Sequence, residues 1–350
     1  MQLSGDYWRA LVSGQHRGLG PTLQCAGLWT ASIPYGWVSR LRNRLYDGGW
    51  KPSHRAPVPV VSVGNLTVGG TGKTPCVEYV AGFYRRHGKR VTILSRGYGA
   101  AGAPNDEALV LEENLRGVSH LQGIDRVALA ARAAAREAAD VLVLDDGFQH
   151  RRLARNLDLV LVDATQTWGL GHLFPRGLLR EGLGGLRRAG VIILTRCDQV
   201  TLFERGRLRE VANRLAPGVP VVEATHRPTE LINSNGASAP LQMLAGRPVV
   251  GFCGIGNPEA FRRTLETLEI RPSDFRTFPD HHRYTAADIS DLERWAGRQA
   301  MDCVVVTTQK DLVKLRLPQL ARKELWALRV RLSIESGQDA LDHKLKEVLE

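Results

Sequence analysis

Cysteine is scarce in this sequence, and long apolar runs are missing from it. The five cysteines, at positions 25, 76, 197, 253 and 303, lie far apart and form no C-x-x-C pair. This pattern argues against a zinc site and against a disulfide framework, and it fits a reducing cytoplasm. No stretch reaches the roughly 20 apolar residues that a membrane-spanning helix needs. The first ten residues also lack the apolar core of a secretory signal.

The composition is otherwise that of a globular protein, with 43% hydrophobic and 24% charged residues in a chain of 350. That length suits one large or two ordinary domains, and no internal repeat is apparent. The formal net charge of +11 favours anionic partners such as nucleotides, nucleic acids or acidic membranes. The arginines are dispersed and no nucleic-acid-recognition motif is present, so we expect no nucleic-acid partner.

An N-terminal segment, residues 1–50, combines aromatic and basic residues. A helix is predicted over residues 34–46, with Pro34 in its first turn. One face of this helix is apolar, through Trp37, Val38, Leu41 and Leu45. Aromatic rings beside arginines are typical of a membrane interface. A helix packed on the domain core would show the same apolar face, and the pattern does not decide between the two.

Strands and helices alternate from residue 56 to about residue 225. Short, nearly continuous apolar strands separated by helices predict a parallel sheet covered by helices on both faces. Ligands of such a sheet bind beyond the carboxyl ends of its strands. The predicted strands are Val58–Val63, Arg90–Leu94, Val141–Leu144, Leu157–Asp163, Val191–Thr195 and Pro220–Ala224, and the predicted helices are 73–87, 124–138 and 202–215.

A glycine-rich loop follows the first predicted strand and ends in Gly-Lys-Thr-Pro. Glycine leaves backbone N–H groups open to a polyphosphate. Lys73 supplies a positive charge for the β- and γ-phosphates, and the Thr74 hydroxyl is a Mg²⁺ ligand. Thr67 stands where this pattern has its first glycine, so Gly69 and Gly70 must make part of the turn. The predicted nucleotide-binding residues are Thr67, Val68, Gly69, Gly70, Thr71, Gly72, Lys73 and Thr74.

A second α/β unit follows the polar stretch 226–246, which we interpret as a linker. We predict a strand at Pro248–Cys253 and a helix that begins at Pro258, with Asn257 as its N-cap. The expected fold class is therefore α/β. It combines a P-loop NTPase-type parallel sheet with helices on both faces, in residues 51–230, and a smaller C-terminal α/β domain, in residues 231–350.

The run Val141-Leu-Val-Leu-Asp-Asp-Gly-Phe-Gln-His150 is the second strong signal. It places Asp145 and Asp146 at the end of an apolar strand. Carboxylates beside a phosphate-binding loop hold Mg²⁺ directly or through water. A single acidic residue after an apolar strand is common by chance. A second aspartate followed by Gly-Phe-Gln-His is much rarer, so the run favours a metal-binding strand end.

Three further segments carry residues suited to chemistry. Arg96, in Ser95-Arg-Gly-Tyr-Gly99, follows a predicted strand and is placed for phosphates or an anionic substrate. Asp106 is either a proton acceptor for a hydroxyl or a helix N-cap. His281, in Asp280-His-His-Arg-Tyr284, suggests a proton-transfer or orienting role, with a solvated loop or a metal site as alternatives. The segment 195–198 loosely matches the guanine-reading element of GTPases, although a plain strand end is the favoured interpretation.

These motifs, in this order, resemble the tetraacyldisaccharide 4′-kinase family of lipid A biosynthesis. The resemblance covers residues from about 28 to 330. Its carriers are Gly64–Pro75, Ser95–Gly99, Asp106-Glu107, Gly123-Ile-Asp-Arg126, Asp145–His150, Leu179-Arg-Glu181, Gly254–Pro258, Asp280-His281 with Tyr284, and Thr307-Thr-Gln-Lys-Asp311.

The resemblance implies a kinase that transfers the γ-phosphoryl group of ATP to the 4′-hydroxyl of a tetraacylated, 1-phosphorylated glucosamine disaccharide. It also implies Mg²⁺ as cofactor and a peripheral association with the cytoplasmic face of the bacterial inner membrane through the N-terminal segment. A monomer is expected. The alternatives are a P-loop GTPase or metallochaperone-like switch, based on the loop and segment 195–198, and a nucleic-acid-binding ATPase, based on the charge.

The resemblance also implies roles for single residues. Lys73 and Asp145 are catalytic, and Thr74, Asp145 and Asp146 manage the metal. Asp106 is the base toward the sugar hydroxyl and is assisted by His281, each from a different domain, so that the domains must close over ATP. The substrate-binding residues are Arg96, Tyr98, His150 and Arg180.

Overall fold

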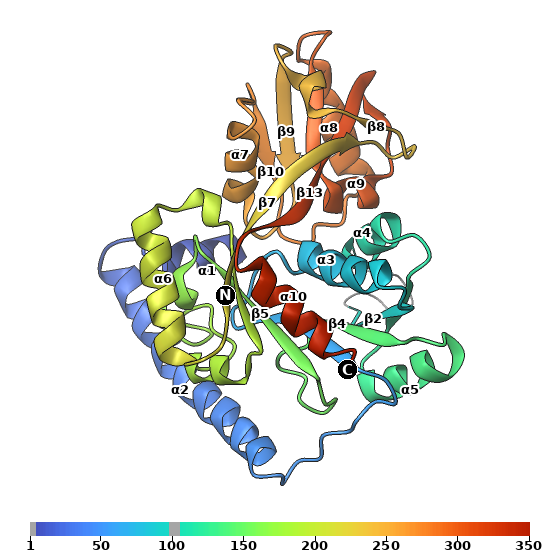
Figure 1. Cartoon of the computed structure of the whole chain (residues 1–350). Helices are drawn as coiled ribbons and strands as arrows, with labels where there is room; N and C mark the ends of the chain where they lie inside the picture. The colour runs from blue at the N-terminus through green and yellow to red at the C-terminus, as the bar shows by residue number, and fades with distance from the viewer. Residues whose placement is uncertain (1–4, 98–105) are drawn as a thin grey trace. The chain divides into compact units, whose positions relative to one another are not determined.

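The structure is a computed structural model that describes residues 5–97 and 106–350 (Figure 1). These residues form two compact units. The first unit takes residues 5–97, 115–226 and 332–350, and the second takes residues 106–114 and 227–331. Two strands, β7 (Val221–Ile232) and β13 (Lys323–Ser336), run through the boundary between the units.

The first unit is built on a parallel sheet with the strand order β6-β5-β1-β4-β2-β3. All of these strands except the edge strand β3 are fully buried, which explains why they read as nearly continuous apolar runs. The first residues of β7 extend the sheet beyond β6. The bounds are β1 (Val60–Asn65), β2 (Val91–Ser95), β3 (Ser119–Gln122), β4 (Val141–Asp145), β5 (Leu157–Asp163) and β6 (Val191–Thr195).

Helices cover both faces of this sheet, as predicted. On one face α3 (Lys73–Arg86) and α10 (Gln338–Glu347) lie side by side (Figure 1), and the Tyr84 hydroxyl donates to the Leu345 carbonyl over 3.0 Å. On the other face, side chains of α5 (Arg126–Arg136) and α6 (Leu202–Leu215) pack against alternate strand residues. The short 3-10 helices η1 (Thr167–Gly171), η2 (Leu183–Arg188) and η3 (Cys197–Gln199) join these elements.

The N-terminal helix is longer than predicted. After α1 (Gly5–Val12), helix α2 runs from Leu19 to Asp47, so it begins 15 residues before the expected start at residue 34. Pro34 lies inside it rather than in its first turn. Because Pro34 faces solvent, water can satisfy the carbonyl that its missing N–H leaves unbonded. None of the helices in the described residues is both long and apolar enough to cross a membrane.

Helix α2 has an unusual distribution of side chains. Its inner face is made of small residues, because Ser32, Gly36 and Ser39 are buried. Its outer face carries exposed apolar residues, among them Trp37, which is 70% exposed. The others are Leu19, Leu23, Trp29, Ile33, Val38 and Leu41. Seven large apolar side chains are therefore exposed along this one helix, which makes its outer face a candidate interaction surface.

The second unit contains a smaller parallel sheet with the order β10-β9-β11-β13. Its strands are β9 (Val249–Cys253), β10 (Phe275–Thr277), β11 (Val304–Thr308) and β13, with the short β12 (Gln319–Leu320) antiparallel to β13 and β8 (Ser238–Ala239) antiparallel to β7. The helices are α4 (Asp106–Asn114), α7 (Pro258–Glu266), α8 (Ala286–Gly297) and α9 (Gln309–Leu315), with η4 (Leu241–Leu244). Asn257 caps α7 as predicted, since its side chain accepts from the Ala260 N–H.

The two units differ from the expected domain ranges in two places. Helix α4 groups with the second unit, where it packs on α9 through an ion pair between Lys310 and Glu107. Helix α10 groups with the first unit, where it packs on α3. The predicted linker 226–246 is also partly regular, because β7 continues to Ile232 and pairs with β8.

Candidate active site

The phosphate-binding loop lies between the carboxyl end of β1 and the start of α3. Gly69 and Gly72 have φ of 120° and 86°, a backbone conformation that favours glycine. At Gly72 a Cβ would also lie 2.1 Å from the ring of His226. Gly70 has no positive φ, so the turn depends on Gly69 and Gly72 rather than on Gly69 and Gly70.

The residue that departs from the usual loop pattern, Thr67, is explained by its neighbours. Thr67 forms an antiparallel bridge with Leu179. On either side of it, the Val68 N–H donates to the Leu178 carbonyl and the Arg180 N–H donates to the Leu66 carbonyl, both over 2.7 Å. Thr67 is therefore part of a short extended pair, in which no glycine is required.

Residues at the ends of β5 and β6 hold the loop in shape. The Thr195 hydroxyl donates to the Thr71 carbonyl over 3.0 Å, and the Arg196 guanidinium donates to the Gly70 carbonyl over 2.7 Å. Arg196 in turn forms an ion pair with Asp163 at the end of β5. Segment 195–198 thus supports the phosphate-binding loop in this structure.

Asp146 lies between two positively charged side chains of the first unit. Its carboxylate accepts from Arg180 through both oxygens at 2.8 Å, and Lys73 Nζ lies 3.6 Å away. Burial alone would raise the pKa of Asp146, but Lys73 and Arg180 outweigh it and the pKa is lowered. The structure therefore brings three predicted residues, from the loop, the β4 end and segment 179–181, into one ion cluster.

The donors available for Mg²⁺ are hard oxygen atoms. Thr74 and Asp145 are both buried, at the start of α3 and the end of β4. A hydroxyl and carboxylates suit Mg²⁺, which takes few protein ligands and completes its shell with phosphates and water. Across residues 5–97 and 106–350, no group of three or more His, Cys, Asp or Glu side chains is arranged for a metal ion. The residues present fit Mg²⁺ bound together with a nucleotide.

His150 lies at the same sheet edge, paired with a residue that the predicted site did not include. Arg126, at the start of α5, places Nη1 3.2 Å from His150 Nδ1. Burial and the Arg126 charge lower the pKa of His150 to about 4, so the ring is neutral near pH 7. The Gly-Ile-Asp-Arg126 motif pointed to Arg126, but only the fold shows its partner. Arg96 is exposed directly after β2, and Tyr98 lies outside the described residues.

Asp106 and His281 are adjacent within the second unit. Asp106 is the first residue of α4 and is 8% exposed, and both of its carboxylate oxygens lie 3.1 Å from His281 Nδ1. Both residues belong to the same unit, so the expectation that they come from different domains is wrong. The reason is the packing of α4 on α9, which ties Asp106 to the unit that carries His281.

The pKa values of Asp106 and His281 are shifted in opposite directions. Burial would raise the pKa of Asp106, but the hydrogen bond with His281 and the charges of Lys310 and Lys314 lower it to about 2. The same hydrogen bond raises the pKa of His281. In the neutral form His281 donates to Asp106 through Nδ1, and Nε2 lies 3.9 Å from Asp280. The arrangement suits a base in which a buried carboxylate orients and supports an imidazole.

A buried network supports this pair. Asp311 is fully buried and accepts from the Gly254 N–H and the Tyr284 hydroxyl, each over 3.0 Å. Lys314 Nζ lies 3.0 Å from Asp311 and 3.9 Å from Asp106. The Gly-Ile-Gly-Asn-Pro and Thr-Thr-Gln-Lys-Asp motifs therefore meet at Asp311, which places them behind the Asp106–His281 pair.

Comparisons with known proteins show the family of this chain. The tetraacyldisaccharide-1-P 4′-kinase family matches residues 25–350. A tetraacyldisaccharide 4′-kinase of Anaeromyxobacter dehalogenans strain 2CP-C is 43% identical over 93% of this chain and 92% of its own length. One from Syntrophus aciditrophicus is 37% identical over 88% and 89%.

A solved structure shares the fold. The crystal structure of LpxK from Aquifex aeolicus in complex with ATP is 30% identical, with a TM-score of 0.74, over 93% of this chain and all of that one. With the family match over nearly the whole length and the motif residues gathered into the two clusters above, this chain belongs to the tetraacyldisaccharide-1-P 4′-kinase family.

Proposed function

We propose that this protein transfers the γ-phosphoryl group of ATP to the 4′-hydroxyl of a tetraacyldisaccharide 1-phosphate. The observation that carries the proposal is the cluster of Lys73, Asp146 and Arg180 on a phosphate-binding loop, in a chain of this kinase family. The GTPase switch has no comparable support, because segment 195–198 contacts the loop backbone.

The first unit supplies the groups for the phosphates. Loop N–H groups and Lys73 bind the polyphosphate and neutralise charge that builds up during transfer. Thr74, Asp145 and Asp146 are the residues that would hold Mg²⁺, which would neutralise negative charge on the phosphates. Arg180 and His150 lie beside this cluster and, with Arg96 and Tyr98, are assigned to the substrate.

The second unit supplies the base. We assign to the Asp106–His281 pair the removal of the proton from the 4′-hydroxyl as the new O–P bond forms. In-line transfer needs a positioned nucleophile more than a covalent intermediate. A carboxylate that is ionised at all working pH values, with a neutral imidazole bonded to it, can accept one proton as a unit.

The outer face of α2 supplies the contact with the membrane. Its exposed tryptophans and aliphatic side chains lie on the same helix as Arg40 and Arg44. Rings at headgroup level and cations near lipid phosphates stabilise an interfacial helix. We propose that the protein works as a monomer bound peripherally to the cytoplasmic face of the inner membrane.

A direct assay tests the function. Purified protein with Mg²⁺, ATP and a 1-phosphorylated tetraacyldisaccharide in detergent micelles should give a bis-phosphorylated lipid, detected by mass. Lys73→Ala should abolish it, and GTP in place of ATP should support little product. A folded protein that binds ATP but makes no bis-phosphorylated lipid would overturn the proposal.

A further inference from the structure

Helix α2 does more than present an apolar face, because its inner face is bonded to the segment that reaches the nucleotide site. The Ser32 hydroxyl donates to the Leu173 carbonyl and accepts from the Arg176 N–H, over 3.0 and 3.1 Å. At Gly36 a Cβ would lie 2.7 Å from the Leu173 side chain. The small inner residues of α2 thus allow close contact with residues 173–181.

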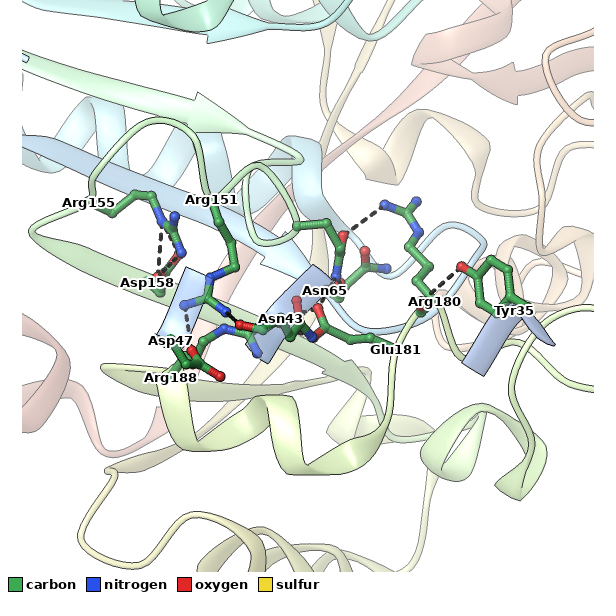
Figure 2. A network of polar contacts seen from close by, with 11 residues as sticks. Tyr35, Asn43, Asp47, Asn65, Arg151, Arg155, Asp158, Arg180, Glu181 and Arg188 are labelled. Atoms are coloured by element: carbon green, nitrogen blue, oxygen red, sulfur yellow. Dashed lines mark hydrogen bonds and ion pairs between the residues drawn. The ribbon is translucent and has the colours of Figure 1, made fainter. Parts of the chain in front are cut away.

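Two hydrogen-bonded lines run from α2 to the phosphate-binding loop. The first starts at Tyr35, whose hydroxyl donates to the Arg180 carbonyl over 2.8 Å (Figure 2). The Arg180 side chain then donates to Asp146 over 2.8 Å, and Asp146 lies 3.6 Å from Lys73. One hydroxyl on α2 is therefore three contacts away from the lysine that serves the phosphates.

The second line starts at Asn43, about two turns further along the helix. The Asn43 amide donates to Glu181 over 2.7 Å (Figure 2). Gln149 donates to Glu181 over 3.0 Å. Gln149 also donates to the Asn65 carbonyl over 2.9 Å, and the Asn65 amide donates to the Thr71 hydroxyl over 2.9 Å. This line ends in the middle of the phosphate-binding loop.

The second line passes through a buried carboxylate, that of Glu181. Glu181 has no exposed surface and also accepts from Arg188 at 2.9 Å through both oxygens. A buried carboxylate keeps a fixed position only while its hydrogen bonds are complete. Loss of the Asn43 donor would therefore let Glu181 and its neighbour Gln149 move, and Gln149 holds the backbone of Asn65.

We infer that Tyr35 and Asn43 are positioning residues for the nucleotide site, and that α2 sets the geometry of the phosphate-binding loop through Arg180 and Glu181. The inference rests on the proposed ATP-dependent function. It makes the helix that faces the lipid a structural part of the site that binds ATP. The inner and outer faces of α2 then have separable roles, and single substitutions can test each.

The test measures ATP binding directly, by calorimetry or a fluorescent ATP analogue, on the full chain. Tyr35→Phe and Asn43→Leu should each raise the Kd for ATP by about three- to tenfold, the range set by one lost hydrogen bond. Tyr46→Phe, on the same helix, and Asn213→Leu, on the exposed face of α6, are the matched controls and should leave the Kd unchanged. In steady-state assays the KM for ATP should rise in both variants.

A double-mutant cycle separates positioning from a general loss of stability. In an Asp146→Asn background the effect of Tyr35→Phe should shrink to within about twofold, and the effect of Asn43→Leu should do so in a Gln149→Leu background. A structural defect unrelated to these lines would keep its full effect in both backgrounds, and that result would refute the inference.

The outcomes for the two proposals differ. If the wild type binds ATP and Lys73→Ala does not, while Tyr35→Phe and Asn43→Leu match the wild type, only the positioning role is wrong. If the wild type itself does not bind ATP, the proposed function and the inference both fail. Thermal unfolding of each variant confirms that the protein is folded at the assay temperature.

Discussion

At the scale of single residues, the site consists of buried charges held in matched pairs. Asp146 lies between Lys73 and Arg180, and Asp106 lies against His281. An ion removed from water is costly unless a partner and hydrogen bonds replace the water. Each of these carboxylates is therefore kept ionised by its neighbours, in the form that metal binding or proton transfer requires.

Replacing the buried carboxylate of the base tests its role. Asp106→Asn should lower kcat by about 10²-fold or more, because the amide can neither accept the proton nor support the imidazolium. Asp302→Asn, an exposed aspartate of the same unit, is the control. Near-normal turnover of Asp106→Asn, in an assay that measures product mass, would remove Asp106 from the mechanism.

The pH dependence follows from the sign of the His281 shift. Asp106, with a pKa of about 2, stays ionised throughout the assay range. The pKa of His281 is raised by Asp106 and Asp280, which outweigh burial and the Lys310 charge. Once His281 is protonated, the pair can no longer accept the proton of the hydroxyl. The value of kcat/KM should therefore fall as the pH drops through the raised pKa of His281. The acid limb of the pH profile should lie above the ordinary histidine value of about 6.5. An acid limb that keeps its position in Asp106→Asn would contradict this assignment.

The loop glycines are not equivalent. Gly72→Ala would combine a positive φ with a clash against His226, whereas Gly70 has neither constraint. We expect Gly72→Ala to lower the free energy of unfolding by about 1–3 kcal/mol and Gly70→Ala to change it by less than about 0.5 kcal/mol. Denaturant unfolding without nucleotide measures both, and equal stability of the two variants would show that His226 moves aside freely.

Motifs whose residues are close together in the chain were predictable from the sequence. The loop ending in Lys73 and Thr74 and the strand ending in Asp145 and Asp146 follow from local spacing, and the structure places them together. The pairing of Arg126 with His150, and of Lys314 with Asp106 and Asp311, joins positions far apart in the chain. Such pairings depend on the fold, and no local pattern specifies them.

At the scale of elements, α2 shows how a local rule can mislead. Proline favours the first turn of a helix, so Pro34 predicted a start there, yet the helix tolerates it on the solvent side. Strands β5 and β6 have the predicted bounds because both are fully buried apolar runs between polar ends. Burial on both faces is a stronger signal than a single helix-start residue.

The outer face of α2 can be tested without disturbing its inner face. Trp37→Ser with Leu41→Ser should weaken binding to lipid vesicles by about tenfold or more, because two apolar side chains no longer leave water. Met301→Ser, an apolar residue of the second unit that is even more exposed, is the control. Deletion of residues 1–45 is a poorer test, since it also removes Tyr35 and Asn43. Equal partitioning of the double variant and the control in a sedimentation assay would assign another surface to the membrane.

At the scale of the whole molecule, the sequence predicted the α/β class and the parallel sheet, but not which segments share a unit. Helix α4 and helix α10 each belong with elements that lie far from them in the chain. Their assignment depends on side-chain packing, such as Lys310 with Glu107 and Tyr84 with Leu345. Domain ranges predicted from consecutive stretches of sequence cannot show that a later helix packs on an earlier unit.

The net charge of the whole molecule predicts an effect of salt. With a formal charge of +11, the protein should bind vesicles that contain anionic lipid more tightly than neutral ones at low ionic strength. Raising salt from about 0.1 to 1 M shortens the screening length from about 10 to 3 Å, so the preference should largely vanish. Binding measured by co-sedimentation that keeps its full anionic preference at high salt would argue against a charge-driven approach.

The return of α10 to the first unit has a consequence for biosynthesis. The nucleotide-binding sheet is covered on one side by a helix, Gln338–Glu347, that follows the whole second unit along the chain. Until it emerges, the Tyr84 hydroxyl lacks the carbonyl that it bonds and the surface of α3 beneath α10 stays open to water. The ATP-binding half of the molecule therefore reaches its final form only after the second unit has been synthesised, so a nascent chain cannot complete that half early.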